Sequence, residues 1–370
     1  MENDYAVIIG LQKYPGLDIN GTAPLSGAEK DALDFKGWIL STNHGNVNPE
    51  NVKTILSSDY SPSTSIDDAH PAILEVIVAF DNLRRASNKN MSEGLGPKVG
   101  RRLYIFMSGH GIAPTPYGNR IAKEAALLMA NADPTNITAP HYHLPGIYTL
   151  TWFCENNCFE EVFLFMDCCR DLTIVPSLNI YLPPKGNESN SKFFYAFATK
   201  WSRRAKENED ENGEVSGVFT RTLLKGLYGA AAEPMDGEQG IITAASLKSY
   251  LYQNMKAFIK PEFLSTEAQE PDVDYWPKEY DGKDIIVNTV PLQKFPVKLR
   301  LPSTASGSVQ ILFNGLQKVE ELRINGNPEL LTKLARGKYS ALTAKNNNPE
   351  YKIFDVTGIE SPGNEKVVDL

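Results

Sequence analysis

A histidine and a cysteine follow two apolar segments of this chain, at the point where each segment ends. Residues 103–111 (LYIFMSGHG) lead into His110, and residues 162–171 (VFLFMDCCRD) lead into Cys168 and Cys169. Short apolar runs bounded by turn residues are typical of buried parallel strands. Because reacting groups gather beyond the carboxyl ends of such strands, we expect the histidine and a cysteine to meet. A thiol needs a base to become a nucleophile, so the pattern predicts a Cys–His hydrolase.

Alternation along the second segment selects one of the two cysteines. Residues two apart on an extended chain face the same side, so Asp167 and Cys169 share a face while Cys168 points into the core. We therefore predict Cys169 as the nucleophile. His110 lies between two glycines, which allow a ligand to approach closely, and is the predicted base and acid. The other histidines lie in predicted loops or at a helix start: His44, His70, His141 and His143.

The elements around these residues alternate between strand and helix. Strands are predicted at residues 5–10, 52–56, 103–107, 162–166, 193–198 and 284–287, the last of these closing the sheet. Helices are predicted at residues 28–40, 69–85, 146–157, 218–227 and 244–256. Such alternation implies right-handed crossovers and predicts an α/β fold, with a mostly parallel sheet flanked by helices. Residues 202–217, which are charged and poor in apolar residues, are predicted to be a mobile loop, and residues 261–283 to be irregular.

The pattern changes near residue 290. Short alternating segments such as PVKLRL, SVQILF and YKIFDV follow, separated by Gly, Asn and Pro. They predict a small antiparallel β domain without a chemical cluster, whose expected role is packing or binding a partner. The expected domains are therefore residues 1–288, which carry the chemistry, and residues 289–370, a β-rich accessory domain.

The net charge, the hydrophobic pattern and the cysteines narrow the range of expected partners and cellular locations. The net charge of −8 argues against binding nucleic acid or an anionic membrane and allows a cationic peptide substrate. We find neither a signal-peptide pattern nor an apolar stretch of 18 residues, so no membrane span is predicted. Of the four cysteines, Cys168 and Cys169 are adjacent and make a poor disulfide framework, which favours reduced thiols in a cytoplasm.

An ordered set of motifs resembles the caspase-like cysteine peptidases, nearest the metacaspase and orthocaspase branch. The histidine precedes Cys169 by 59 positions, close to the roughly 50 of caspases. Further matches follow in the expected order over about residues 1–285: YAVIIGLQKYPGL at 5–17, LSGAEKDALDFKGW at 25–38, FFYAFAT at 193–199 and GVFTRTLLKGL at 217–227. Metacaspases usually have His-Ser-Gly after the nucleophile, whereas this chain has Arg170-Asp171, closer to animal caspases.

The resemblance implies roles for further residues. The backbone N–H groups of Gly111 and Cys169 would form an oxyanion hole. Asp31 and Asp167 would line the pocket for the P1 side chain, the residue before the cleaved bond, with Ser108 beside them. Two carboxylates in one pocket favour a Lys or Arg side chain, so we expect an endopeptidase that cleaves after basic residues.

The sequence gives weaker signals for cofactors, metal ions and self-cleavage than for the active site. The sequence predicts no cofactor and leaves calcium activation open, because the acids of calcium-dependent relatives are not clearly matched. Structural zinc is the rival use of the cysteines and histidines, but no pair of cysteines has the usual Cys-x2-Cys spacing. Basic residues in two polar loops are candidate self-cleavage positions, since exposed loops are preferred sites of nicking: Lys185, Arg203, Arg204 and Lys206.

Two other functions stay open from the sequence. One is a catalytically silent caspase-like scaffold, against which the intact Cys–His pair argues. The other is a protease that processes a single partner protein in signalling, defence or programmed cell death.

Overall fold

The structure is a computed structural model of the 370-residue chain. It describes residues 3–17, 25–114, 124–133, 135, 142–170, 189–200, 205–209, 213–236, 238–259, 269–345 and 348–370. The chain forms two compact units, which consist of Met1–Leu224 with Met255–Ile285 and of Lys225–Asn254 with Ile286–Leu370. The expected domain boundary after residue 288 stays a prediction.

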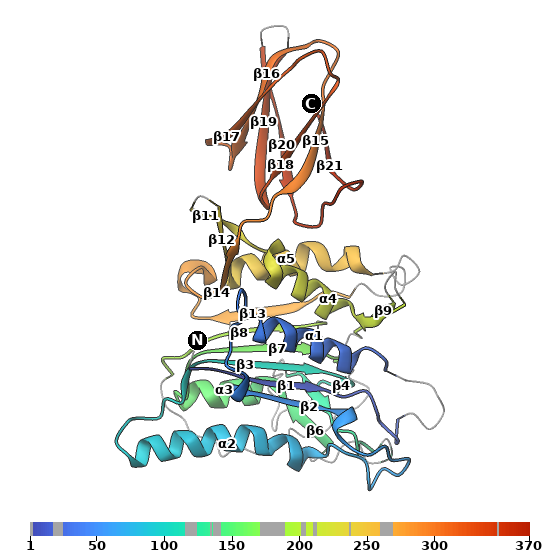
Figure 1. Ribbon diagram of the computed structural model, residues 1–370, viewed down its shortest axis with the longest axis vertical. Coiled ribbons are helices and arrows are strands. Elements are labelled where there is room, and N and C mark those ends of the chain that lie inside the picture. The colour runs from blue at the N-terminus through green and yellow to red at the C-terminus, as the bar shows by residue number, and fades with distance from the viewer. Residues whose placement is uncertain are drawn as a thin grey trace. The chain divides into compact units, whose positions relative to one another are not determined.

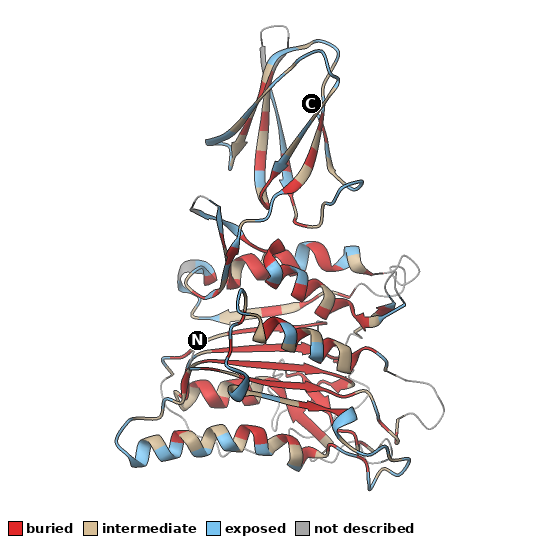
Figure 2. Ribbon diagram, viewed as in Figure 1, coloured by how far each residue is buried: buried red, intermediate tan, exposed pale blue. Residues whose placement is uncertain are grey.

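A six-stranded sheet forms the centre of the first unit (Figure 1). Its strands in spatial order are β13 (Asp272–Trp276), β8 (Lys192–Phe197), β7 (Phe159–Asp167), β3 (Gly100–Ser108), β1 (Asp4–Gly10) and β2 (Val52–Leu56). All neighbours pair in parallel except β13, which is antiparallel to β8. The central strands β3 and β7 are buried along most of their length (Figure 2), as strands covered on both faces must be. The predicted α/β fold with a mostly parallel sheet is confirmed.

Helices cover both faces of this sheet (Figure 1). On one face lies α1 (Ala28–Leu40), whose Phe35 ring stacks on Phe106 of β3 with the ring centroids 4.6 Å apart. On the other face the alternate residues of β3 share a core with α2 (Ile73–Ser92) and α3 (Gly146–Glu155). Each fully buried large apolar side chain contributes about 1.5–3 kcal/mol, so this two-sided core fixes the strand ends that carry the candidate site.

Two predicted elements are wrong in position. The helix predicted at 69–85 begins only at Ile73, because the residue before Pro71 is disfavoured in the helical conformation. The strand predicted at 284–287 is not part of the six-stranded sheet. The edge strand of that sheet is β13, which lies in the segment predicted to be irregular. The sequence pattern did not predict β13, because Asp272 and Asp274 interrupt its apolar residues and its partner β8 is far away in the sequence.

Two small sheets complete the first unit. One contains β4 (Gly111–Ile112), β5 (Ala126–Leu128) and β6 (His143–Pro145), and the other β9 (Glu207–Glu209) and β10 (Val215–Gly217). Helix α4 (Val218–Lys225) follows β10 directly. The hairpin of β9 and β10 corrects the prediction of a loop at 202–217. Its residues are polar, and tertiary hydrogen bonds hold it, such as that from Asn208 Nδ2 to the carbonyl of Phe258 at 2.6 Å.

The second unit combines a helix with β-sheets. Helix α5 (Ala244–Asn254) accompanies a sheet of β11 (Glu233–Asp236), β12 (Gln239–Thr243) and β14 (Ile286–Pro291). Two further sheets follow: β18 (Glu329–Leu334), β15 (Phe295–Arg300) and β21 (Lys366–Asp369), and then β17 (Gln317–Arg323), β16 (Ala305–Phe313), β19 (Gly337–Lys345) and β20 (Asn348–Val356). Their pairing is antiparallel apart from β15 with β21, which confirms the predicted β-rich C-terminal region.

The remaining helical turns are short. Among the described residues they are the 3₁₀ helices Pro49–Asn51, Ser57–Asp59, Met255–Phe258 and Glu279–Gly282, and the π-helical turn Gly226–Ala230. No helix among the described residues is both long and apolar enough to cross a membrane.

Candidate active site

The polar ends of β3 and β7 lie together. In the parallel register Ser108 is opposite Asp167, and the N–H of Gly109 donates to the carbonyl of Asp167 at 3.2 Å. The chain therefore leaves the sheet at the same edge after both strands, which brings the segments that carry His110 and Cys169 to one place.

One small pocket collects the predicted residues at this edge. Its volume is about 160 Å³. It is lined by Leu25, Asp31, Ser108, Gly109, His110, Asp167, Cys169, Ala205, Lys206, Glu207 and Gly217. The predicted nucleophile, base and three substrate-binding residues are thus brought together, although they come from three segments far apart in the sequence.

The two adjacent cysteines have different surroundings. Cys168 is buried in the hydrophobic core, and burial raises the pKa of its thiol far above the ordinary value, so this thiol stays protonated. Cys169 is partly exposed, and it lines the pocket together with Asp167. The Sγ atom of Cys169 accepts a hydrogen bond from the N–H of Ala205 at 3.3 Å. Of the two thiols, only that of Cys169 faces a space that a substrate could enter.

A buried tyrosine fixes the backbone of the predicted base. The hydroxyl of Tyr14 accepts the N–H of His110 at 3.0 Å, and the two rings meet edge to face with centroids 4.8 Å apart. A Cβ atom at Gly109 would overlap this hydroxyl, and the φ of +153° at Gly109 also favours glycine. Tyr14 lies in the first motif of the chain, but nothing in the local pattern indicates that it contacts His110.

The carboxylates of the pocket are buried and hydrogen-bonded. Asp31 accepts the N–H of Gly217 at 3.0 Å and the hydroxyl of Ser108 at 3.2 Å. Oδ2 of Asp167 accepts both the N–H of Thr220, at 3.0 Å, and its hydroxyl, at 2.7 Å. A Cβ atom at Gly217 would overlap Asp167 Oδ2 and approach Asp31 Oδ2, so both carboxylates converge on this glycine. Asp31 therefore belongs to the buried face of α1 rather than to a solvated one.

A third acidic residue, Glu207, lines the pocket together with Asp31 and Asp167. Glu207 of β9 accepts the backbone N–H groups of Ser26 and Gly27 at 3.1 and 3.0 Å. Sequence reasoning missed Glu207 because the residue lies in the segment predicted to be a mobile loop. Its charge adds to the repulsion that Asp31 and Asp167 exert on each other.

Burial and repulsion raise the pKa values of both aspartates. Burial raises the pKa of Asp31 well above its usual range, and the charges of Asp167 and then Glu207 add to the effect. Burial raises the pKa of Asp167 from 3.8 to about 6 against the opposing hydrogen bonds from Thr220, with Glu207 again raising it. A cationic side chain bound between the two carboxylates would lower both pKa values again.

This shift makes a prediction for stability. Between pH 3.8 and about 6, folded Asp167 keeps a proton that the unfolded chain has lost, so its contribution to stability is lost as the pH rises through about 6. A shift of that size corresponds to about 3 kcal/mol. Urea unfolding between pH 4 and 7.5 should show a smaller loss of stability in Asp167→Asn than in wild type. Parallel pH profiles of the two proteins would contradict this.

The structure describes one of the four candidate self-cleavage residues. Lys185, Arg203 and Arg204 lie outside the described residues. Lys206 lines the pocket, and its carbonyl accepts the N–H of Val218 at 3.0 Å. The hydrogen bond from the first residue of α4 holds the carbonyl of Lys206, so cleavage after Lys206 would first require this hydrogen bond to break.

Within the described part of the chain, no cluster of three or more His, Cys, Asp or Glu side chains could hold a metal ion. All four cysteines belong to the zinc alternative; Cys154, Cys158 and Cys168 lie in the hydrophobic core, and Cys169 lines the pocket. His141 lies outside the described residues.

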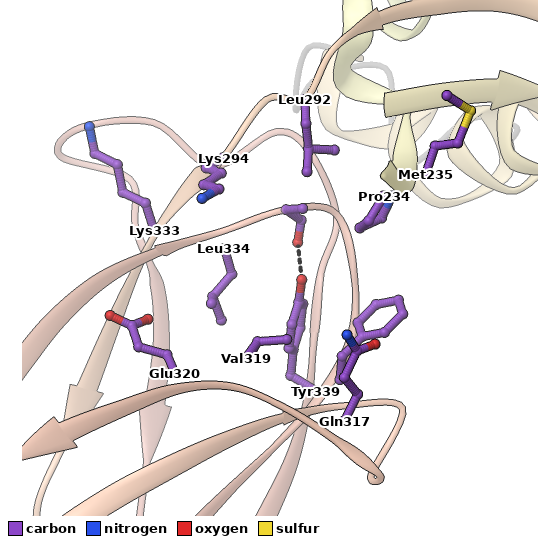
Figure 3. A pocket seen from close by; sticks show the side chains of 12 residues that line it. Pro234, Met235, Leu292, Lys294, Gln317, Val319, Glu320, Lys333, Leu334 and Tyr339 are labelled. Atoms are coloured by element: carbon purple, nitrogen blue, oxygen red, sulfur yellow. Dashed lines mark hydrogen bonds between the residues drawn. The ribbon is translucent and has the colours of Figure 1, made fainter. Parts of the chain in front are cut away.

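A larger cavity lies in the second unit. Its volume is about 620 Å³, and its lining comes from the β11 hairpin and the C-terminal strands (Figure 3). The lining residues include neither cysteine nor histidine, and Glu320 is their one acid. Because this lining offers no nucleophile beside a base, the smaller pocket around Cys169 is the candidate active site.

One curated protein is similar to this chain in sequence. The chain is 25% identical over 340 residues to a curated probable protease from a Desulfuromonadales bacterium, a match that covers 85% of this chain. It spans only 38% of the length of that relative. No family model matches the sequence.

Two solved structures are similar at 14% identity, and each match covers 74% of this chain. One is a protein from Geobacter sulfurreducens, with 93% of its length covered and a TM-score of 0.41. The other is caspase-1 from Spodoptera frugiperda, with 88% covered and a TM-score of 0.38.

Proposed function

We propose that this chain is a caspase-like cysteine endopeptidase that cleaves after arginine or lysine. The observation that carries the proposal is the single pocket in which Cys169 and His110 lie beside buried carboxylates. A thiol and an imidazole supply a nucleophile and its proton partner, and the carboxylates supply a site for a cationic side chain. The similarity to a probable protease supports the same conclusion.

The reaction follows from these groups. The thiolate of Cys169 attacks the scissile carbonyl while His110 carries the proton of the thiol. His110 gives that proton to the leaving amine, which departs and leaves a thioester on Cys169. The same imidazole then takes a proton from water, whose oxygen attacks the thioester and releases the acid product.

The backbone near Gly111 suits an oxyanion hole. The carbonyl of His110 accepts the N–H of Leu128 at 2.8 Å, which makes Gly111 and Leu127 a non-hydrogen-bonded pair of β4 and β5. The N–H of Gly111 therefore points away from β5. A Cβ atom at Gly111 would contact the carbonyl of Cys169 and the side chain of Cys168, so this backbone lies against the nucleophile's own. These features support the N–H groups of Gly111 and Cys169 as the donors.

Three acids around a pocket favour arginine over lysine at P1. Arginine presents five donors in a planar fork, whereas lysine presents a compact charge. Thr220 occupies Oδ2 of Asp167, and Oδ1 accepts no hydrogen bond from the residues that the structure describes. We expect this oxygen and Asp31 to bind the guanidinium, with Glu207 strengthening the attraction.

An activity-based probe tests the proposal and separates it from a silent scaffold. A peptidyl acyloxymethyl ketone with Arg at P1 should add one probe mass to wild type, and peptide mapping should place it on Cys169. A probe with Asp at P1 should not react. If the Arg probe leaves the folded protein unlabelled, the scaffold is the better hypothesis. Cleavage profiling over a peptide library then tells a broad endopeptidase from one confined to a single partner.

Self-processing is a prediction of its own. An enzyme specific for Arg or Lys carries substrate sequences at Lys185, Arg203, Arg204 and Lys206, so we expect slow self-cleavage at one of them that depends on Cys169. Intact mass after long incubation measures it. If wild type cleaves peptides yet stays full length, as Cys169→Ala does, self-processing is not part of the mechanism.

The wider setting stays a prediction. It comprises a cytoplasmic location, a role in defence or programmed cell death, and a partner for the C-terminal β strands.

A further inference from the structure

The residue after the nucleophile is a fully buried arginine with an unusual set of contacts. The guanidinium of Arg170 has no solvent exposure and lies over the ring of Phe197, 5.1 Å from the centroid. Its Nη1 donates to Asp272 Oδ2 at 2.7 Å and to the carbonyl of Thr199 at 3.3 Å. Its Nε donates to the carbonyl of Glu124 at 3.3 Å.

These contacts join the segments that surround the candidate site. Asp272 belongs to β13, Thr199 follows β8, and Glu124 precedes β5, whose partner β4 contains Gly111. Arg170 itself follows the turn that carries Cys169. One side chain thus ties the nucleophile's backbone to two neighbouring strands and to the segment beside the expected oxyanion donor.

Stability alone does not account for this arrangement. Nη2 of Arg170 is buried and has no hydrogen-bond partner among the residues that the structure describes. A buried ion pair costs desolvation of both charges, and an apolar pair of similar volume is often as stable or more so. An incompletely satisfied guanidinium therefore contributes little to the stability of a core, but its fork can fix two backbone carbonyls and one carboxylate at defined distances.

We propose that Arg170 is a positioning residue that fixes the direction of the Cys169 thiol and N–H relative to His110 and Gly111. The inference depends on the proposed function only in taking Cys169 as the nucleophile. Arg170 does not line the substrate pocket, so its loss should affect turnover more than substrate binding.

The chain offers a matched control at the opposite end of the same strands. Arg102 at the start of β3 is also largely buried, donates to Glu161 at 2.6 Å, and lies 5.4 Å from the centroid of Phe163. Arg102→Lys perturbs the sheet in a similar way, but far from the candidate site. Arg170→Lys keeps the charge and removes the fork.

The experiment compares wild type, Arg170→Lys, Asp272→Asn and Arg102→Lys. We measure kcat and KM with an Arg-P1 peptide, the rate of Cys169 alkylation by iodoacetamide, and unfolding in urea. Arg170→Lys should lower kcat by about 10- to 100-fold with KM within about twofold, since small misplacements of reacting groups cost that much. Its alkylation rate should change as well, while Arg102→Lys stays near wild type in both. Asp272→Asn should change kcat and alkylation in the same direction.

Opposite results overturn the inference. A kcat and alkylation rate within twofold of wild type in folded Arg170→Lys would do so, as would equal losses in Arg102→Lys. Should Arg170→Lys not fold, an unchanged kcat and alkylation rate in Asp272→Asn would decide against it. If wild type cleaves no peptide, the proposed function fails, and the alkylation rates still test Arg170.

Discussion

Replacing Cys169 by alanine should lower peptide turnover by about 10⁴-fold or more while the protein stays folded. Nucleophiles of hydrolases act as a unit with their base, and removing one member costs on this order. The side chain of Cys169 lines a pocket and is not part of the hydrophobic core, so its truncation should leave the free energy of unfolding almost unchanged. Turnover of an Arg-P1 peptide and urea unfolding measure the two effects.

The neighbouring thiol provides the control. Cys168→Ala should keep most of the activity, because the thiol of Cys168 is buried and its raised pKa keeps it protonated. It should lower stability by about 1–2 kcal/mol, since it removes a packed side chain from the core. Full turnover in Cys169→Ala, or complete loss in folded Cys168→Ala, would show that the assignment of the nucleophile is wrong.

The second large effect concerns the residue at P1. Peptides with Arg or Lys at P1 should be cleaved, and peptides with Asp at P1 should not, because an anion would enter a pocket already lined by three acids. Asp31→Asn and Asp167→Asn should each lower kcat/KM for the Arg peptide by about 10²-fold. That is the usual cost of removing one partner of a buried charge pair. Steady-state kinetics on matched peptides that differ only at P1 measure both expectations.

A nearby acid serves as the control. Asp34 lies one turn beyond Asp31 on α1, but it is only partly buried, does not line the pocket and pairs with Lys30 at 2.6 Å, so Asp34→Asn should leave kcat/KM unchanged. The raised pKa values also predict that kcat/KM for the Arg peptide rises with pH through about 6, as Asp167 loses its proton. Efficient cleavage after Asp, or wild-type kinetics in both pocket variants, would exclude the pocket as the source of specificity.

Much of the fold could be predicted because its signals are local. The strands that carry the chemistry are continuous apolar runs, and α1 shows apolar residues at helical spacing from Ala28 to Ile39. Parallel pairing then requires that the ends of neighbouring strands meet, which is why His110 and Cys169 could be placed together from the sequence. The alternation Asp167, Cys168, Cys169 likewise distinguishes the pocket thiol from the core thiol.

Local patterns therefore predict most of the strands and helices that carry the site and the residues that follow them. Which distant polar residues enter the site depends on the packing of the folded chain. Glu207 reaches the pocket from a polar hairpin, Tyr14 holds the backbone of His110, and Asp272 meets Arg170 across 102 positions. Hydrophobic periodicity reports only which face of an element is buried. It carries no information about a hydrogen bond or an ion pair whose partner lies on another element, and such contacts form only when the packed core brings the two together.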